Sequence, residues 1–311
     1  MSRPAAANGS VTLAIVTAIL VWGGNNVGMK VLVRDWPLLF TGSTRFLFAG
    51  AFLVLVLRLV PKLAGPGGIV LTPLQRRHLW IRGGIPLAGY CVLTHWCLVY
   101  IPASHFSLCL AASPAWALLW EDRFRFRRDS ATHYLGIMLT LVGVVVLLWP
   151  SLTGNRGEWF GELLAVASGI VWVIYNQSCR VLSQDGLSGI QTAGSTMWRA
   201  GAIVAAPAIF ELVSVGPFPV TATTLGIQAY CIIGGGTAYM LWNWALSHWP
   251  VSRVSLVGNL NPISTMVAAW LLIGEKLSAN FFVSLALILG GVFIGQFSKT
   301  RAKALRAGPE A

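Results

Sequence analysis

The chain has 311 residues, of which 56% are hydrophobic and 10% are charged. A soluble globule must cover its surface with polar groups, so this composition excludes a soluble protein and indicates an integral membrane protein. The formal net charge of +12 does not indicate a nucleic-acid partner. The basic residues are scattered at the ends of apolar segments and form no single patch interleaved with aromatic rings.

Ten mostly apolar segments follow one another along the chain. Because a helix rises 1.5 Å per residue and crosses the hydrocarbon layer in about 20 residues, each segment predicts one membrane span. The predicted spans are 11–32, 38–59, 79–100, 104–121, 134–150, 160–181, 190–213, 222–247, 253–273 and 279–297. We therefore expect an all-α integral membrane protein embedded in the lipid bilayer.

Most of the 22 basic residues lie on the side of the membrane that holds the N-terminus. The positive-inside rule assigns that side to the cytoplasm. We expect a multi-pass protein of the bacterial cytoplasmic (inner) membrane with both termini in the cytoplasm, where 1–10 forms an N-terminal tail and 299–311 a basic C-terminal tail. Arg3 and the small residues after it lead directly into the first span, which predicts no cleaved signal peptide and no transit peptide.

The chain contains an internal repeat. Residues 93–144 align without a gap with residues 241–292, and the starts of the two halves agree as well. Identical pairs include Trp22 and Trp172, Asn26 and Asn176, Pro102 and Pro250, Ser107 and Ser255, Pro114 and Pro262, and Gly143 and Gly291. A repeat of this length is a five-helix half and not a solenoid unit. We predict a first repeat over 11–152 and a second over 153–298.

Five spans per half is an odd number, so the second half enters the bilayer upside down relative to the first. Inverted repeats can adopt the same two conformations in exchanged roles, which opens a shared central cavity alternately to each side of the membrane. Such alternating access is the geometry of a carrier. Neither a membrane enzyme nor a receptor requires it.

Several short motifs agree with this interpretation. They are Trp22-Gly23-Gly24-Asn25, Arg45-Phe46-Leu47, the block from Pro102 through Ser107-Leu108 to Pro114, and in the second half Pro250, Ser255-Leu256, Pro262 and Gly274-Glu275. Together they resemble the EamA-type branch of the drug/metabolite transporter superfamily over essentially the whole chain. The resemblance implies ten helices in two inverted five-helix repeats around a central cavity. The chain departs from it at Phe126-Arg127, where the family often carries Gly-Glu.

Within the superfamily, the aromatic-rich interior is similar to that of the YddG-type exporters of aromatic amino acids. This resemblance implies export of small amphipathic metabolites, chiefly aromatic and other neutral amino acids. All ten acidic residues fall in loops, tails or the outer turns of spans, whereas ion-coupled exchangers usually place a carboxylate at mid-membrane. We therefore expect facilitated diffusion down the gradient of the substrate, through a chain that functions as a monomer.

Polar groups within spans are expected to face the bundle interior, because they are costly against lipid. They occur at matched positions of the two halves, and the predicted substrate-binding residues are Trp22, Asn26, Tyr90, Thr94, His95, Trp172, Tyr175, Asn176, Tyr239, Trp242 and Asn243. A cavity lined by these rings suits a flat apolar ligand with a polar end. For Trp22 and Trp172 the alternative is an interfacial tryptophan belt, although both lie about midway along their spans.

Three further intramembrane residues carry a charge or can titrate. His95 either faces the site or forms a neutral hydrogen bond between helices, and its counterpart Asn243 cannot titrate, which excludes a symmetric proton relay. Arg45 and Arg199 lie well inside their spans, where an uncompensated charge is costly. Each must extend to the membrane surface or find partners, and its role is structural or carboxylate-binding. Arg45 either binds a substrate carboxylate or caps carbonyl groups at a helix C-terminus, and we favour the structural role.

Gly23 and Gly24 weaken the first span, while Pro114 and Pro262 remove a main-chain hydrogen bond from the fourth and ninth spans. These four residues are predicted gating hinges, with a static kink as the alternative for the prolines. The five cysteines lie within spans, show no metal-ligand spacing and are expected to pack as small apolar residues. We expect no metal, no cofactor and no catalytic residues.

Two rival functions remain open. A multidrug exporter of flat organic cations is the first, because tryptophan rings can hold a cation without a carboxylate. An intramembrane enzyme is the second, and it would require paired aspartates, a Gly-x-Ser-x-Gly nucleophile or a His-Glu-x-x-His metal site. The sequence contains none of these motifs.

Overall fold

The computed structural model describes residues 5–65, 68–113, 115–116, 131–153, 158–249 and 251–307, which form helices and short connections without any strand. The helices of the first half are α1 (Ala5–Asp35), α2 (Leu38–Leu59), η1 (Pro61–Leu63), α3 (Pro73–His78), η2 (Leu79–Gly84), α4 (Ile85–Tyr100), α5 (Ala103–Ala111) and α7 (Ala131–Thr153). Those of the second half are α8 (Glu158–Gln184), α9 (Gly189–Val215), α10 (Ala222–His248), α11 (Val251–Gly258), α12 (Asn261–Ile273) and α13 (Ala279–Ala307).

Each of the ten predicted spans coincides with helix in the described residues, which confirms the all-α membrane fold. Four helical stretches are long and apolar enough to cross a membrane as single helices: Gly9–Asp35, Leu38–Leu59, Glu158–Gln184 and Gly189–Val215. Some of the other spans are divided. The third consists of the π-helical turn η2 and α4, with α3 directly before it, and the ninth consists of α11 and α12.

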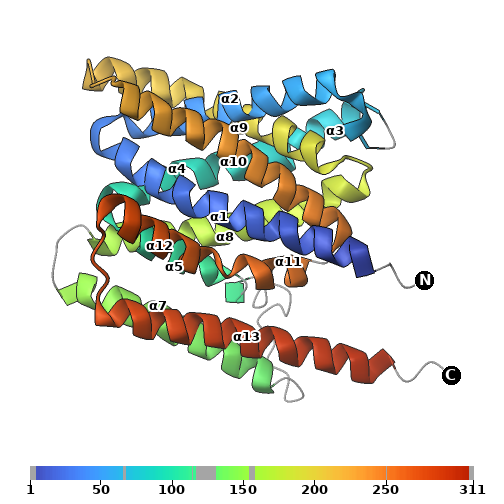
Figure 1. Ribbon diagram of the computed structural model, residues 1–311, viewed down its shortest axis with the longest axis vertical. Helices are drawn as coiled ribbons and strands as arrows, with labels where there is room; N and C mark the ends of the chain where they lie inside the picture. Colours follow the sequence, from blue (N-terminus) through green and yellow to red (C-terminus); the bar gives the residue numbers. More distant parts are fainter. Residues whose placement is uncertain are drawn as a thin grey trace.

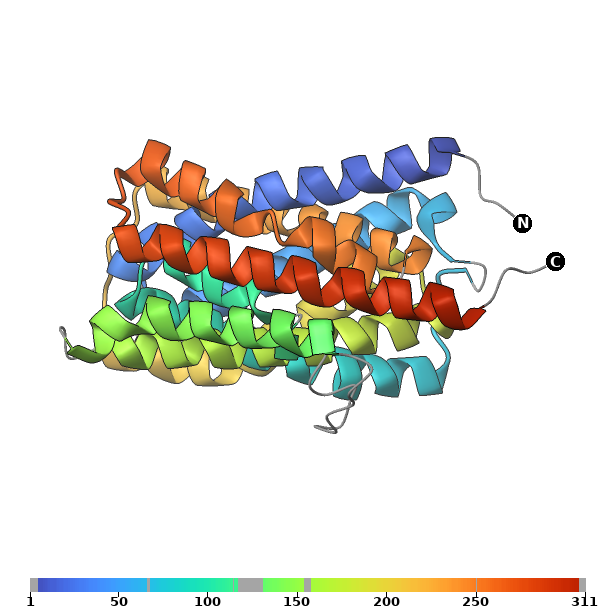
Figure 2. The same cartoon turned by 90° about the horizontal axis from the view of Figure 1, so that it is seen from below.

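Successive spans run in opposite directions, so that α1 begins and α13 ends at the same end of the bundle (Figures 1 and 2). We call this the terminal end and the opposite one the distal end. The helix α1 runs from the terminal to the distal end, whereas its counterpart α8 runs from the distal to the terminal end (Figure 1). The two five-helix halves are therefore inverted relative to each other, as predicted.

The helix contacts come in matched pairs that exchange the two halves. The most extensive contacts join α2 to its counterpart α9 and α7 to its counterpart α13. The contact of α1 with α10 is matched by that of α8 with α4. The pair of α7 and α13 forms a separate layer beside the remaining helices (Figure 1). A pseudo-twofold axis between inverted repeats requires this kind of exchange.

Glycines set the distance between α2 and α9. A Cβ atom at Gly50 would lie 2.2 Å from the backbone nitrogen of Trp198, and one at Gly201 would lie 2.4 Å from that of Leu47. The two helices therefore touch backbone to backbone at two places, and the Ser43 hydroxyl donates to the Gly201 carbonyl at 3.0 Å. In a bilayer, where lipid is as apolar as the side chains, close contact through small residues is a main source of helix association.

The fourth and ninth spans are interrupted at equivalent residues. Ala112 follows α5 and Leu260 precedes α12, and both have φ −75° and ψ −9°. Pro262 lies in the first turn of α12, where its missing N–H leaves no hydrogen bond unmade. The expected kink within a continuous ninth helix is therefore wrong. The span is instead two helices, α11 and α12, separated by Asn259 and Leu260.

Two glutamates bind the beginnings of first-half helices at the distal end. Glu211 on α9 accepts from the backbone N–H groups of Leu39 and Phe40 at 2.8 and 2.9 Å, at the start of α2. Glu275 follows α12 and accepts from the first two N–H groups of α5, each at 3.2 Å. A carboxylate stabilises a helix N-terminus because it accepts from unpaired N–H groups and opposes the positive end of the helix dipole.

A third contact lies at the same end. Glu162 on α8 is fully buried, and its Oε1 lies 3.1 Å from Nδ1 of His105 on α5. The His105 ring also stacks on Phe281 of α13 at 6.0 Å. In all three contacts, which we call the distal clamps, a second-half carboxylate holds a helix of the first half.

Candidate central binding site

A small cavity of about 50 Å³ lies between the two halves. The helices α1, α2, α4 and α5 of the first half and α8, α10, α11 and α12 of the second half contribute to its wall. Its lining consists of Trp22, Asn26, Met29, Arg45, Tyr90, Ser107, Leu110, Ala111, Ser113, Trp172, Tyr239, Trp242, Ser255, Gly258, Asn259, Asn261 and Pro262.

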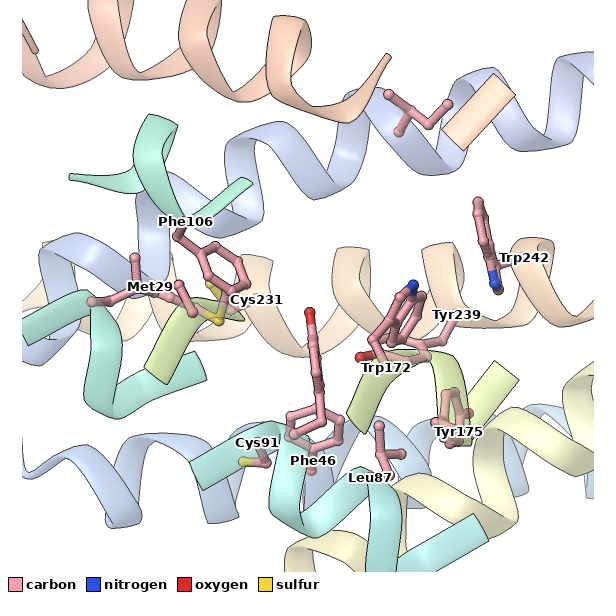
Figure 3. Packing of buried hydrophobic residues seen from close by; sticks show 14 of the residues in the cluster. Met29, Phe46, Leu87, Cys91, Phe106, Trp172, Tyr175, Cys231, Tyr239 and Trp242 are labelled. Carbon is pink, nitrogen blue, oxygen red and sulfur yellow. The ribbon is translucent and has the colours of Figure 1, made fainter. Parts of the chain in front are cut away.

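Aromatic rings from four helices, α1, α4, α8 and α10, meet at this cavity. The Trp22 ring lies 5.7 Å from that of Trp172, 5.4 Å from Tyr239 and 5.2 Å from Trp242, measured between centroids. The Tyr90 ring lies 5.1 Å from Trp172. Figure 3 shows the rings of Trp172, Tyr239 and Trp242 gathered where α8 and α10 face each other. These five residues, which we call the aromatic cluster, include equivalent tryptophans from both halves.

The aromatic cluster fills most of the space it surrounds. A single water needs about 10–15 Å³ of cavity, so 50 Å³ holds about four waters and no amino acid. The rings contact one another in edge and tilted geometries that are favourable for aromatic pairs. A ligand with an aromatic side chain therefore enters only when these rings separate and exchange their mutual contacts for contacts with the ligand.

Trp242 is held more firmly than its neighbours. Its Nε1 donates to Oδ1 of Asn176 at 2.9 Å, which ties α10 to α8. On its far side the ring rests on Gly258, where an added Cβ atom would lie 2.6 Å from Cη2. Gly258 ends α11, immediately before the interruption of the ninth span. The hydrogen bond and the absence of a side chain at Gly258 together fix the position of this ring.

The two intramembrane arginines lie in different surroundings. Arg45 lines the cavity, is only 2% exposed, and directs Nη1 to the Met29 sulfur at 2.7 Å, with its guanidinium 4.7 Å from the centre of the Phe46 ring. Arg199 does not line the cavity. It donates to the Ser195 carbonyl at 2.8 Å and packs over the rings of two tryptophans. The partner of Arg199 is thus a carbonyl inside its own helix. The carbonyl contact expected for Arg45 is not found among the described residues.

The structure brings together six of the predicted substrate-binding residues on the cavity wall, namely Trp22, Asn26, Tyr90, Trp172, Tyr239 and Trp242. Both Trp22 and Trp172 face the interior, so the alternative of an interfacial belt is wrong for them. The other five, which are Thr94, His95, Tyr175, Asn176 and Asn243, are buried but do not line the cavity.

Four of those five residues make hydrogen bonds to other protein groups. His95 donates from Nδ1 to the Cys91 carbonyl at 2.8 Å. The Tyr175 hydroxyl lies 3.1 Å from that of Thr196 on α9, and Asn243 donates to the carbonyl of Tyr239 within its own helix at 3.0 Å. Tyr175 and Asn176 thus join α8 to α9 and to α10, whereas the bonds of His95 and Asn243 stay within one helix.

The predicted glycine hinge is a point of close helix packing. A Cβ atom at Gly23 would lie 2.1 Å from the Ser264 hydroxyl of α12, and one at Gly24 would lie 2.6 Å from the Tyr230 hydroxyl of α10. The latter hydroxyl donates to the Val21 carbonyl at 2.9 Å. Pro262 lines the cavity, and Pro114 lies outside the described residues.

Sequence reasoning did not select several small and polar lining residues, chiefly Ser107, Ser113, Ser255, Asn259 and Asn261. A signal for them exists, because Ser107 and Ser255 are an identical pair of the repeat and Ser113 and Asn261 immediately precede its two prolines. They reach the cavity because the fourth and ninth spans are interrupted there. Interrupted helices commonly form the central site of a carrier.

An all-α membrane bundle with two inverted five-helix halves and a shared central cavity defines a carrier-type membrane protein. The profile of the "EamA-like transporter family" matches residues 9–149 and again residues 159–295. The chain therefore belongs to the EamA-like transporter family, within the drug/metabolite transporter superfamily. The family predicted from the motifs is confirmed.

Similar proteins extend over nearly the whole chain. The chain is 25% identical to the "Probable amino-acid metabolite efflux pump" of Escherichia coli (strain K12), over 93% of this chain and 96% of that protein. It is 23% identical to the "Probable terminal-alkyne amino-acid exporter" of Streptantibioticus cattleyicolor, over 90% and 91%. A crystal structure with 22% identity superposes with a TM-score of 0.64 and covers 93% of this chain and 98% of that one, which supports the fold.

Proposed function

We propose that the protein exports small amphipathic metabolites, above all aromatic and other neutral amino acids, across a bacterial inner membrane. The observation that carries this proposal is the aromatic cluster, which both halves contribute around one shared cavity. The planar side chain of a substrate can replace the contacts that the rings of the aromatic cluster make with one another by contacts of the same kind. The empty and the occupied cavity therefore have similar energies. The amino-acid exporters among the similar proteins support the same substrate class.

The transport cycle follows from the inverted halves. One conformation opens the cavity to the distal end, the other opens it to the terminal end, and the aromatic cluster lies between the two openings. Among the described residues that line the cavity there is no carboxylate. A site that couples transport to a cation usually contains one. We propose facilitated diffusion, in which the cytoplasmic concentration of the substrate drives net export.

The test is uptake into proteoliposomes of labelled tryptophan, phenylalanine, threonine and a flat organic cation, with and without an imposed pH gradient. We expect saturable uptake of the amino acids, fastest for those with aromatic side chains and unchanged by the gradient. Uptake of the cation alone would replace the proposal by the multidrug alternative. Strict dependence on the pH gradient would overturn facilitated diffusion.

Gly258 is expected to set the size of the accepted side chain. In a Gly258→Ala variant the new Cβ atom meets the Trp242 ring, which cannot retreat without breaking its hydrogen bond to Asn176. The ring moves into the cavity, so we expect tryptophan to compete for uptake about tenfold less well while threonine competes as before. Competition assays measure this ratio. Gly290→Ala is the matched control, because nothing lies within 4 Å of a Cβ atom there.

A further inference from the structure

The proposed function leaves open how the two charged groups of an amino acid are bound. We propose that Arg45 binds the carboxylate of the substrate and that Asn261 accepts from its ammonium group, so that the cavity selects zwitterions. This inference rests on the proposed function and adds the polar contacts that the aromatic cluster cannot provide.

Arg45 has no acidic partner among the described residues. The ion pairs found there are His78 with Asp185 and His105 with Glu162. Its Nε has no hydrogen-bond partner, and its contacts are the Met29 sulfur and the Phe46 ring. A buried charge without a counter-ion is costly. A carboxylate that arrives in the adjoining cavity would supply both the missing charge and an acceptor for Nε.

The backbone of α10 approaches this guanidinium closely because Gly235 has no side chain. A Cβ atom at Gly235 would lie 3.6 Å from both Nε and Nη2 of Arg45, and 2.8 Å from Nδ2 of Asn25. Asn25 donates its amide to the Cys231 carbonyl at 3.2 Å and therefore holds α1 against α10 beside Arg45. The guanidinium is thus supported by neutral groups on all the elements that it contacts, and its donor capacity is only partly used.

A second unused polar atom lies on the same cavity wall. Asn261 is 8% exposed, lines the cavity and has an Oδ1 atom without a hydrogen-bond partner. It begins α12, directly after the interruption of the ninth span. An amide oxygen is a good acceptor for an ammonium group and carries no net charge. A cationic donor and a neutral acceptor on one wall match the two ends of a zwitterion.

Arg199 is a buried arginine whose contacts are those of a structural residue. It donates to a carbonyl of its own helix and packs over Trp80 and Trp198, and it lies away from the cavity. Arg199→Gln is therefore the matched control for Arg45→Gln, since both remove a buried intramembrane guanidinium and only one removes it from the cavity wall.

The experiment measures dissociation constants of the detergent-solubilised full chain for tryptophan, tryptamine and indole-3-propionate. Tryptamine lacks the carboxylate and indole-3-propionate lacks the ammonium group, while all three share the indole ring. For Arg45→Gln we expect tryptophan and indole-3-propionate to bind at least tenfold more weakly and tryptamine to change less than twofold, because charge-assisted hydrogen bonds are the strong ones. For Asn261→Ala we expect tryptophan and tryptamine to weaken about threefold or more and indole-3-propionate to remain unchanged.

Equal losses for all three ligands in Arg45→Gln, or losses of the same size in Arg199→Gln, would overturn the inference. If Arg45→Gln does not fold, Arg45→Lys keeps the charge but not the planar fork, and the same ligand ranking with a smaller loss is expected. Failure of the proposed function looks different. In that case the unaltered protein transports no amino acid, whether or not Arg45→Gln weakens the binding of indole-3-propionate.

Discussion

Replacing Gly50 by valine is expected to destroy the contact between α2 and α9 and to reduce the folded yield severely. The new Cβ atom would lie 2.2 Å from the backbone nitrogen of Trp198, and a backbone cannot move aside as the end of a side chain can. Overpacking in a well-packed core costs about 1–3 kcal/mol and occasionally more, so we expect about 3 kcal/mol or more at this site. Thermal unfolding of the purified protein in detergent measures the loss.

Gly226→Val is the matched control for this prediction. Gly226 lies on α10, is exposed, and has no atom within 4 Å of an added Cβ. It therefore introduces the same side chain into a membrane helix without touching a neighbour. If Gly50→Val were as stable as Gly226→Val, backbone contact between α2 and α9 would not be a main source of stability.

Trp22→Ala is expected to lower transport of tryptophan at least tenfold in a protein that still folds. Trp22 contacts the rings of Trp172, Tyr239 and Trp242, and each aromatic pair contributes about 0.5–1.5 kcal/mol beyond the area it buries. Removing the central ring enlarges the cavity and deprives the substrate of its stacking surface. A tenfold change corresponds to about 1.4 kcal/mol, which one or two such contacts supply.

Two variants separate the loss of the ring from a general defect. Trp22→Phe retains an aromatic surface and should keep most of the rate. Trp270→Ala removes an indole from a position on α12 that is 63% exposed and should leave uptake unchanged. Initial rates in proteoliposomes, normalised to the amount of reconstituted protein, provide the comparison. Normal transport by Trp22→Ala would place the substrate outside the aromatic cluster.

The fold was predictable from the sequence because the patterns that indicate it extend over many residues. A span of about 20 apolar residues and a gapless repeat of 93–144 in 241–292 average over many side chains, so the spans and the inverted halves were both found. The interruption of the ninth span was not predicted. Pro262 indicated a kink, but a proline is equally compatible with the first turn of a new helix, and only the positions of Asn259 and Leu260 decide between the two.

The candidate site was only partly predictable. Trp22, Trp172 and Trp242 lie on the cavity wall, and for Trp22 and Trp172 the signal was their matched mid-span position in the two halves. Thr94 and Asn243 were also expected there, yet they are buried without lining the cavity. Helical periodicity gives the face of a residue relative to its own helix but not the rotation of that helix in the bundle. That rotation depends on contacts such as Gly189 against Asn243 and Trp244.

We expect the distal clamps to make the two states of an alternating-access cycle energetically unequal. Glu275 corresponds in the repeat to Arg127, and Glu162 corresponds to Thr12, so neither carboxylate has an acidic equivalent in the first half. Exchanging the roles of the halves therefore brings no equivalent carboxylate to these two positions of the repeat. A difference of about 1.4 kcal/mol already populates one state tenfold over the other. If the distal end lies outside the cell, as the positive-inside rule predicts, we expect the empty carrier to be open mainly toward the cytoplasm.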